Sequence, residues 1–511
     1  METREAPGPA ISTVTPTKYS NPANPPKSPV NTIVVSLALR SLAFFIGLQA
    51  VSFFYAKAFY DSYIAKPVSS GFWDRVDQER SELWSVAEDS KVKSIKGFHH
   101  AFETVDAEDG KVRLHYITNS PASGTGSKQS KDLVILLHGW PDNCMVWRNV
   151  LPQLNREPFI LIAPDIPGHG GSQSLPNYRP ASVLIVLFHF IISMRRQHLS
   201  TTKEGSGTSS KVILVGHDWG AAISARLASE TPELVDQVIL TNGPIAHFAI
   251  ENVKQHLGLS YTHFRAHNMT QAWQIARPYL AQVFLRSSYI WAFNLPPPLI
   301  RPLGTVGNMW FLRFIAKQAN GTSEDGESDV VVRSLAEILG PNRDAAGSDV
   351  NSAYHSSVHE RAGALNVRFF ESLRLYREGL ASGLWEQSSK VKAARALLTT
   401  TSPPKATNDT SNTLAATQPT HALKVPLTML FCIEDHALDY RICVDGVEDY
   451  LCEDSVVLKF KAKKGRRIGH WTPITASDEL TRAVKWVAGG KLGDLPRALG
   501  DRINVVDVIR K

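Results

Sequence analysis

Five consecutive residues, Gly216-His217-Asp218-Trp219-Gly220, carry the clearest chemical signal in the chain. They follow the apolar run 211–215 and precede 221–228, so the pattern predicts a strand, a sharp turn and a helix. A glycine on each side of the apex permits the strained backbone of a nucleophile elbow, where bulky neighbours would clash. The usual apex residue is serine, and here it is Asp218. Its ionised carboxylate can attack a carbon centre without a base and form an ester with the substrate.

Two further groups that would complete such a site lie downstream. The apolar run 426–433 ends at a carboxylate, where the acid of a catalytic triad is expected. We predict Asp435 in this role, because its short side chain suits a fixed hydrogen bond; Glu434 and Asp439 are the nearest alternatives. His470 follows the next predicted strand. The order nucleophile, acid, histidine is that of α/β-hydrolases, and the absence of an elbow serine disfavours a serine esterase.

Backbone donors for the same site are predicted next to two tryptophans. His138-Gly139-Trp140-Pro141 ends the apolar run that starts at residue 132. In α/β-hydrolase architecture this loop turns an amide toward the nucleophile, and the residue after the nucleophile supplies a second amide. The donors would be Trp140 and Trp219, each stabilising an oxyanion by ~3–4 kcal/mol.

The elements that must position these residues follow from continuous apolar runs. Runs at 132–139, 158–168, 211–218 and 235–243 are uninterrupted, which predicts a parallel sheet covered by helices on both faces. Runs at 425–435 and 455–462 continue the sheet, and a helix is expected over 478–487. Residues 99–106 and 111–119 alternate around Glu108-Asp109-Gly110 and predict a hairpin.

The strand pattern stops between the two halves of this core. We predict core segments at 90–245 and 421–511, separated by a helical, aromatic-rich cap at 246–385. Residues 386–420 are rich in Ser, Thr, Ala and Pro and are expected to be a flexible insert.

The N-terminal part differs from the rest of the chain. Residues 1–30 are poor in large apolar side chains and are predicted to be disordered. Residues 32–60 are apolar enough for a transmembrane or membrane-interface helix, which predicts a membrane protein, single-pass and with the endoplasmic reticulum as a candidate location. A cleaved signal peptide is disfavoured, because about thirty polar residues precede the apolar part.

Composition excludes other classes. The 511 residues are 43% hydrophobic and 20% charged with a net charge of +7, and the basic residues are scattered, which disfavours nucleic-acid binding. The four cysteines show neither metal-ligand nor disulfide-framework spacing, and we expect no metal. We also expect no cofactor.

Several short motifs occur in one order along the chain: HGWPD at 138–142, DIPGHGGS at 165–172, GHDWG at 216–220, SYIWAFNLP at 288–296 and GHW at 469–471. With them the chain resembles an epoxide hydrolase of the α/β-hydrolase superfamily. The resemblance implies an α/β-hydrolase fold with an inserted helical cap and a small hydrophobic epoxide as substrate. It also implies that Asp218 opens the epoxide, and that His470, oriented by Asp435, activates water to release a diol.

The resemblance further implies two cap tyrosines that donate hydrogen bonds to the epoxide oxygen. Tyr289 matches the first position. At the second, Leu365 to Phe369 puts Arg368 where a tyrosine is usual, so Tyr376 or Arg368 are the candidates.

Two other functions are compatible with parts of the pattern. A haloalkane or haloacid dehalogenase uses the same Asp nucleophile, but the haloalkane enzymes often carry an asparagine where this chain has Trp140. A membrane-tethered, non-catalytic α/β-hydrolase-fold protein is disfavoured by the intact Asp-Asp-His set.

Overall fold

The computed structural model describes residues 29–65, 68–86, 91–120, 132–199, 210–320, 328–347, 352–401 and 421–511. The chain divides into two compact units, 1–45 and 46–511, and the larger unit contains the sheet and the helical insertion. The predicted disordered tail falls outside the described residues except for its last two positions.

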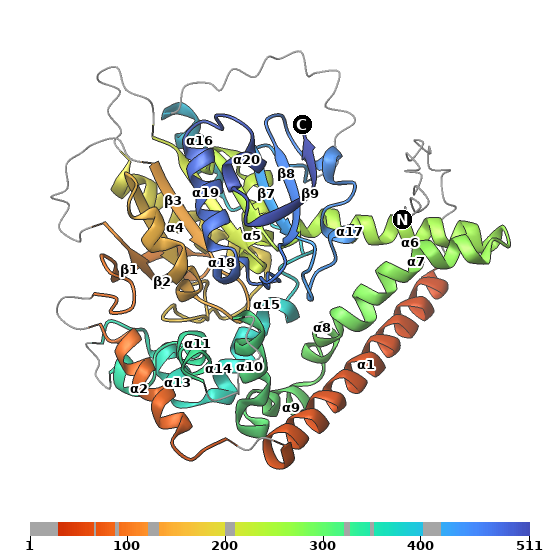
Figure 1. The fold of residues 1–511 in the computed structure, drawn as a ribbon, viewed down its shortest axis with the longest axis horizontal. Coiled ribbons are helices and arrows are strands. Elements are labelled where there is room, and N and C mark those ends of the chain that lie inside the picture. The colour runs from red at the N-terminus through yellow and green to blue at the C-terminus, as the bar shows by residue number, and fades with distance from the viewer. Residues whose placement is uncertain are drawn as a thin grey trace, which may run out of the picture. The chain divides into compact units, whose positions relative to one another are not determined.

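The core of the larger unit is one twisted sheet (Figure 1). Among the described residues its strands run in the order β1-β2-β4-β3-β5-β6-β7-β8-β9. Their bounds are β1 His99–Ala107, β2 Gly110–Thr118, β3 Asp132–Leu137, β4 Phe159–Pro164, β5 Val212–His217, β6 Gln237–Thr241, β7 Leu427–Cys432, β8 Val456–Ala462 and β9 Ile503–Arg510.

The pairing of the strands confirms a mostly parallel sheet. The pairs from β4 through β3, β5, β6, β7 to β8 are all parallel. β1 and β2 form the predicted hairpin, with Ala107 opposite Gly110. β9, which the sequence analysis did not predict, adds an antiparallel edge to β8.

Helices cover both faces of the sheet, which explains why its strands read as continuous apolar runs. One face packs against α4 (Pro180–His198) and α5 (Trp219–Glu230). The other face packs against η2 (Cys144–Asn149), α3 (Leu151–Leu154) and α19 (Ser477–Ala488), the last of which agrees with the predicted C-terminal helix.

A long helical insertion separates β6 from β7, as predicted. Its main helices are α6 Ala246–Arg265, α7 Met269–Ala281, α8 Ser288–Phe293, α9 Pro297–Ile300, α10 Val306–Ala319, α11 Asp329–Leu339, α12 Arg343–Ala346, α13 Ser356–Gly363, α14 Leu365–Ser372 and α15 Arg374–Arg377, with η4 Gln282–Arg286 joining α7 to α8 and η5 Arg301–Gly304 following α9. In the predicted flexible insert, residues 389–401 form the helix α16 and 402–420 lie outside the described residues.

Short elements complete the fold: η3 Pro232–Leu234, α17 Tyr440–Cys443, η7 Val447–Tyr450, α18 Thr472–Thr475 and α20 Leu495–Leu499.

The N-terminal apolar segment is helical. α1 covers Pro29–Phe59, continues as the π-helix η1 (Tyr60–Ala65), and is followed by α2 (Phe72–Trp84). The stretch Arg40–Ile64 is long and apolar enough to cross a membrane, by length and composition. Core helices and signal sequences can share these two properties.

Candidate active site

The predicted elbow forms between β5 and α5. Asp218 takes φ 52° and ψ −117°, a conformation that costs an L-residue roughly 1–3 kcal/mol and often marks a functional position. Gly220 is required two residues later, because a Cβ there would lie 2.1 Å from the carbonyl oxygen of Leu137. The turn therefore presents the Asp218 carboxylate at the carboxyl edge of the sheet, where it lines a cavity.

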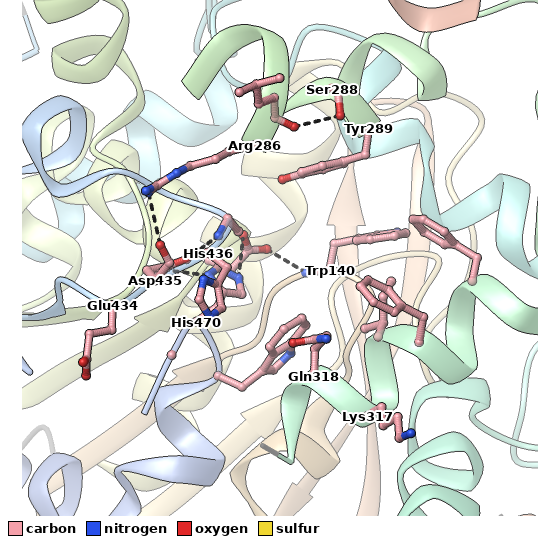
Figure 2. Close-up of a pocket in the computed structure, with 18 of the residues that line it drawn as sticks. Trp140, Arg286, Ser288, Tyr289, Lys317, Gln318, Glu434, Asp435, His436 and His470 are labelled. Atoms are coloured by element: carbon pink, nitrogen blue, oxygen red, sulfur yellow. Dashed lines mark hydrogen bonds and ion pairs between the residues drawn. The ribbon is translucent and has the colours of Figure 1, made fainter. Parts of the chain in front are cut away.

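His470 lies between two carboxylates in this cavity (Figure 2). Its Nε2 is 3.5 Å from Asp218 Oδ2, and its Nδ1 is 2.9 Å from Asp435 Oδ2. The structure thus brings together the three residues predicted as nucleophile, base and acid, although they come from three separate parts of the chain.

Three hydrogen bonds besides the one with His470 fix the carboxylate of Asp435. Its Oδ1 accepts hydrogen bonds from the amides of Ala437 at 2.7 Å and Leu438 at 2.9 Å. Its Oδ2 accepts one from the Asn242 side chain at 2.7 Å. The sequence analysis missed Asn242; its signal was an Asn-Gly pair directly after the strand β6.

The two alternative acids have other partners. Glu434 accepts a hydrogen bond from the amide of Ala462 at 2.8 Å. Asp439 caps α17 and pairs with Arg441 at 2.6 Å. The geometry therefore favours Asp435 as the partner of His470.

The pKa values of Asp218, Asp435 and His470 depend on one another. Burial alone would raise the pKa of Asp218, but His470 and the amide of Trp140 hold that pKa below its ordinary value. Burial would likewise raise the pKa of Asp435, which His470 and Asn242 lower. Burial opposes the charge on His470, yet the two carboxylates raise its pKa well above the ordinary value.

The first predicted backbone donor reaches the nucleophile. The amide of Trp140 donates to Asp218 Oδ1 at 2.8 Å, the oxygen on the side away from His470. Trp219 begins α5 directly after the nucleophile, and its ring meets that of Tyr376 at 5.0 Å between centroids. The role of the Trp219 amide as a second donor stays a prediction.

Two tyrosines from the helical insertion line the same cavity as Asp218. They are Tyr289 on α8 and Tyr376 on α15, with ring centroids 6.0 Å apart. Burial raises the pKa of both phenols, and the charge of Asp218 raises them further, so both stay protonated and able to donate. In Figure 2 the Tyr289 side chain extends from α8 toward the side of the cavity where Asp435 and His470 lie.

Arg368 occupies a different place. Its guanidinium donates to the carbonyls of Pro341 at 2.7 Å and Arg361 at 3.4 Å, and it borders a separate small cavity. Of the two candidates for the second donor, the structure brings Tyr376 and not Arg368 to the Asp218 cavity.

One buried cluster has the ligand types of a metal site. His115, Cys144 and Asp165 offer atoms within 4.8 Å of one another. The Asp165 carboxylate already accepts hydrogen bonds from His115 at 2.7 Å, the Cys144 amide at 2.7 Å and the Gly171 amide at 2.8 Å. We interpret the cluster as the hydrogen-bonded support of the loop after β4.

The comparisons with known proteins agree with this architecture. Residues 132–282 match the alpha/beta hydrolase fold family. Mouse epoxide hydrolase 3 is 28% identical over 185 residues, covering 36% of this chain and 39% of that protein. A soluble epoxide hydrolase of Corynebacterium is 31% identical over 128 residues, covering 25% and 37%. A haloalkane dehalogenase of Psychrobacter cryohalolentis is 28% identical over 157 residues, covering 30% and 46%.

The matched segments thus span less than half the length of these three relatives. The chain has an α/β-hydrolase fold with a helical insertion and is related to epoxide hydrolases. The resemblance noted in the sequence is confirmed at this level.

Proposed function

We propose that the protein opens an epoxide to a vicinal diol through a covalent ester on Asp218. The observation that carries this proposal is one cavity lined by the elbow carboxylate, a histidine between two carboxylates, and two protonated tyrosines. Tyr289 and Tyr376 can each donate a proton to an alkoxide leaving group. Opening an epoxide produces such an alkoxide, whereas a halide leaves without needing a proton.

In the first step, Asp218 Oδ2 attacks an epoxide carbon as the ring C–O bond breaks. Trp140 holds the other oxygen, Oδ1, so Oδ2 is the oxygen free to react. The alkoxide takes a proton from the hydroxyl of Tyr289 or Tyr376. The product of the step is a hydroxyalkyl ester on Asp218.

Ester formation prepares the second step. It removes the negative charge next to His470 Nε2 and so lowers the pKa of the imidazole toward the range of a general base. His470 Nε2 first returns its proton to the tyrosinate left by ring opening, and then takes a proton from a water that attacks the ester carbonyl carbon. The oxyanion forms on Oδ1, where the Trp140 amide already donates. As the bond to the former Oδ2 breaks, that oxygen takes the second proton of the water and leaves with the diol, which restores the Asp218 carboxylate and the His470 imidazolium.

Haloacid or haloalkane dehalogenation is the second candidate, since one relative is a haloalkane dehalogenase. A halide leaving group needs free N–H donors. The indole Nε1 of Trp140 donates instead to Ser372 Oγ at 3.0 Å, and the ring of Trp219 packs edge-on against that of Tyr376, 5.0 Å between centroids. These contacts favour the epoxide.

A membrane association through residues 40–64 is part of the proposal. An interfacial helix would bring the enzyme to the phase in which apolar epoxides dissolve, and the endoplasmic reticulum is the candidate membrane. A single-pass helix over this whole stretch would break the contacts that Gly47 and Ser62 make with α8 and α10. Flotation with liposomes tests this membrane association. The full chain is expected to float with the liposomes, and its recovery in the bottom fraction of the gradient would contradict the association.

A single-turnover reaction in oxygen-18 water tests the chemistry. With enzyme in excess over styrene oxide, we expect an unlabelled diol and one labelled oxygen in the Asp218 carboxylate. Label in the diol of that first turnover would instead mean direct attack by water. Release of halide from 1-chlorobutane without any diol from epoxides would favour the dehalogenase.

A further inference from the structure

The C-terminal half of the apolar helix α1 forms one wall of the catalytic cavity. Its lining residues are Ile46, Gln49, Ala50, Phe53 and Phe54, spaced 3, 1, 3 and 1 apart. This spacing defines one face of a helix. The cavity, of about 1320 Å³, is also lined by Asp218 and His470, so the helix and the reacting groups border the same space.

This wall is fixed by packing and hydrogen bonds. Gly47 lets α1 approach α8, since a Cβ there would lie 2.6 Å from the carbonyl oxygen of Trp291. The Tyr55 hydroxyl donates to the carbonyl of Leu299 at 2.8 Å, and the ring of Phe54 lies 5.2 Å from that of Phe311. A helix that served only as a tether would need none of these contacts.

The contacts continue into η1. Trp310 Nε1 donates to Asp61 Oδ2 at 2.8 Å, and the buried Ser62 hydroxyl donates to the carbonyl of Gly307 at 2.6 Å. Both partners lie on α10, which also supplies Phe311 to the cavity. α1, η1 and α10 are therefore one packed body.

The cavity is larger and more apolar than a small epoxide requires. Its volume exceeds the upper end of the usual range for small-molecule sites, about 300–1,000 Å³. Bulky apolar side chains at its border remain exposed, among them Phe53 (61%), Leu285 (73%) and Phe314 (44%). A long hydrocarbon substituent would cover these groups and gain roughly 25 cal/mol per Å² of apolar area removed from water.

We propose that this face of α1 is the specificity-determining wall of the substrate site, and that the preferred substrate is an epoxide carrying a long hydrocarbon chain. The chain lies along Phe53 and Phe54 while the ring is held between Asp218 and the two tyrosines. This inference rests on the proposed epoxide opening.

The test compares two phenylalanines of the same helix. Phe53 lines the cavity, whereas Phe59 is equally exposed at 58% and does not line it. The measured quantity is the ratio of kcat/KM for 1,2-epoxydodecane to that for 1,2-epoxybutane, using the full chain in one detergent. We expect Phe53→Ala to lower this ratio about tenfold, chiefly through KM, and Phe59→Ala to leave it unchanged.

A second variant guards against effects on folding. Ala50→Phe adds bulk to the wall and is expected to lower the same ratio, with a thermal unfolding midpoint close to that of the wild type. Equal ratios in the wild type, Phe53→Ala and Ala50→Phe would overturn the proposal.

Binding separates this inference from the proposed chemistry. In an Asp218→Asn background no ester forms, so the affinity for 1,2-epoxydodecane reports on the wall alone. We expect Phe53→Ala in that background to weaken binding about tenfold and Phe59→Ala to have no effect. If the wild type opens neither epoxide but Phe53→Ala still weakens binding, the proposed function is wrong and the role of α1 in substrate binding is supported. Equal affinities of the Phe53→Ala and Phe59→Ala variants would refute that role.

Discussion

Tyr289 and Tyr376 are the residues on which the choice of an epoxide over a halide depends. Both tyrosines are partly buried in the cavity that Asp218 lines, and they keep their protons because desolvation and the nearby carboxylate raise their pKa. In the proposed mechanism both hydroxyls donate to the epoxide oxygen, so the two are expected to share the work.

Removing the hydroxyls one at a time tests this sharing. We expect Tyr289→Phe and Tyr376→Phe each to lower kcat for ring opening by about 10²-fold, and the double variant to abolish it, since proton transfer contributes ~10²–10⁴-fold. Tyr279→Phe is the matched control, because Tyr279 is a buried tyrosine of α7 outside the cavity lining. Full activity of the double variant in a diol assay would be inconsistent with the proposed proton donors.

Asp142, next to the site, has a pKa above the ordinary value of an aspartate. Burial raises its pKa to about 7, against the lowering effect of the hydrogen bond that Trp471 Nε1 donates at 3.0 Å. In the unfolded chain its pKa is about 3.9. As pH rises from about 4 to 7 the unfolded state ionises first and binds fewer protons, so Asp142 makes the fold less stable.

Asp142→Asn removes this penalty and still accepts the Trp471 hydrogen bond. We expect the variant to be more stable than the wild type at pH 8, by on the order of 2 kcal/mol, with a smaller gain at pH 4.5. Chemical denaturation at both pH values measures the change in the free energy of unfolding. Asp106→Asn, at an exposed position of β1, is the control. A gain independent of pH would assign the effect to packing.

At this scale the sequence identified the residues whose positions follow from chain order. Asp218, Asp435 and His470 each end or follow an apolar strand, and parallel strands bring such ends together. The choice between Tyr376 and Arg368 needed coordinates, because both lie on short helices whose orientation depends on packing in the insertion. Asn242 was missed because its role depends on contact with a residue 193 positions away.

At the scale of elements, the packing of α1 on α8 is the contact that joins the N-terminal helix to the site. Gly47 is a point of close approach, because a Cβ there would lie 2.6 Å from the carbonyl oxygen of Trp291.

Gly47→Ala is therefore expected to destabilise the protein by roughly 1–3 kcal/mol, as overpacking does, and to weaken substrate binding by moving the wall. Gly258→Ala on α6 is the control. A Cβ at residue 258 meets nothing within 4 Å, and replacing a helical glycine by alanine gains roughly 0.5–1 kcal/mol. Thermal unfolding compares the two, and equal effects would mean that α1 does not pack closely on α8.

The sequence predicted strands and long helices better than edges and short pieces. β3 to β8 were recognisable because burial on both faces makes them continuously apolar. β9 covers one edge and is mostly exposed or half-buried, and its polar residues, Asp507 among them, interrupt the apolar ones without a regular period, which weakens its signal. The Ser-, Thr- and Pro-rich composition of 386–420 as a whole predicted a flexible insert and hid the helix formers Ala, Leu, Lys and Arg within 389–401. That segment forms α16, whose Arg395 pairs with Glu233 at 3.0 Å.

At the scale of the whole molecule, the N-terminal helix belongs partly to the larger unit, 46–511, which holds the candidate active site. The division between the two compact units falls at residues 45 and 46, just before the first cavity-lining residue of α1. Length and composition predicted the helix, but they gave no indication that its second half would line the site, because that depends on contacts with α8 and α10.

Two truncations separate these parts. Removing residues 1–45 is expected to preserve the unfolding midpoint and epoxide turnover within about twofold, because the cavity wall remains. Removing residues 1–64 also deletes the wall and exposes its partners Phe311 and Trp310, so we expect aggregation or loss of turnover. Equal activity of both truncated proteins in a diol assay would contradict the assignment of α1 to the catalytic body.

The central claim is that the carboxylate of Asp218 becomes covalently bonded to its substrate. The most direct measurement is the intact mass of His470→Gln, and of its Asp218 peptide, after brief exposure to styrene oxide. The account predicts a mass increase equal to one epoxide, located on Asp218 and absent from the double variant Asp218→Asn/His470→Gln. A His470→Gln protein that forms diol without such an adduct, or carries the adduct on another residue, would contradict it.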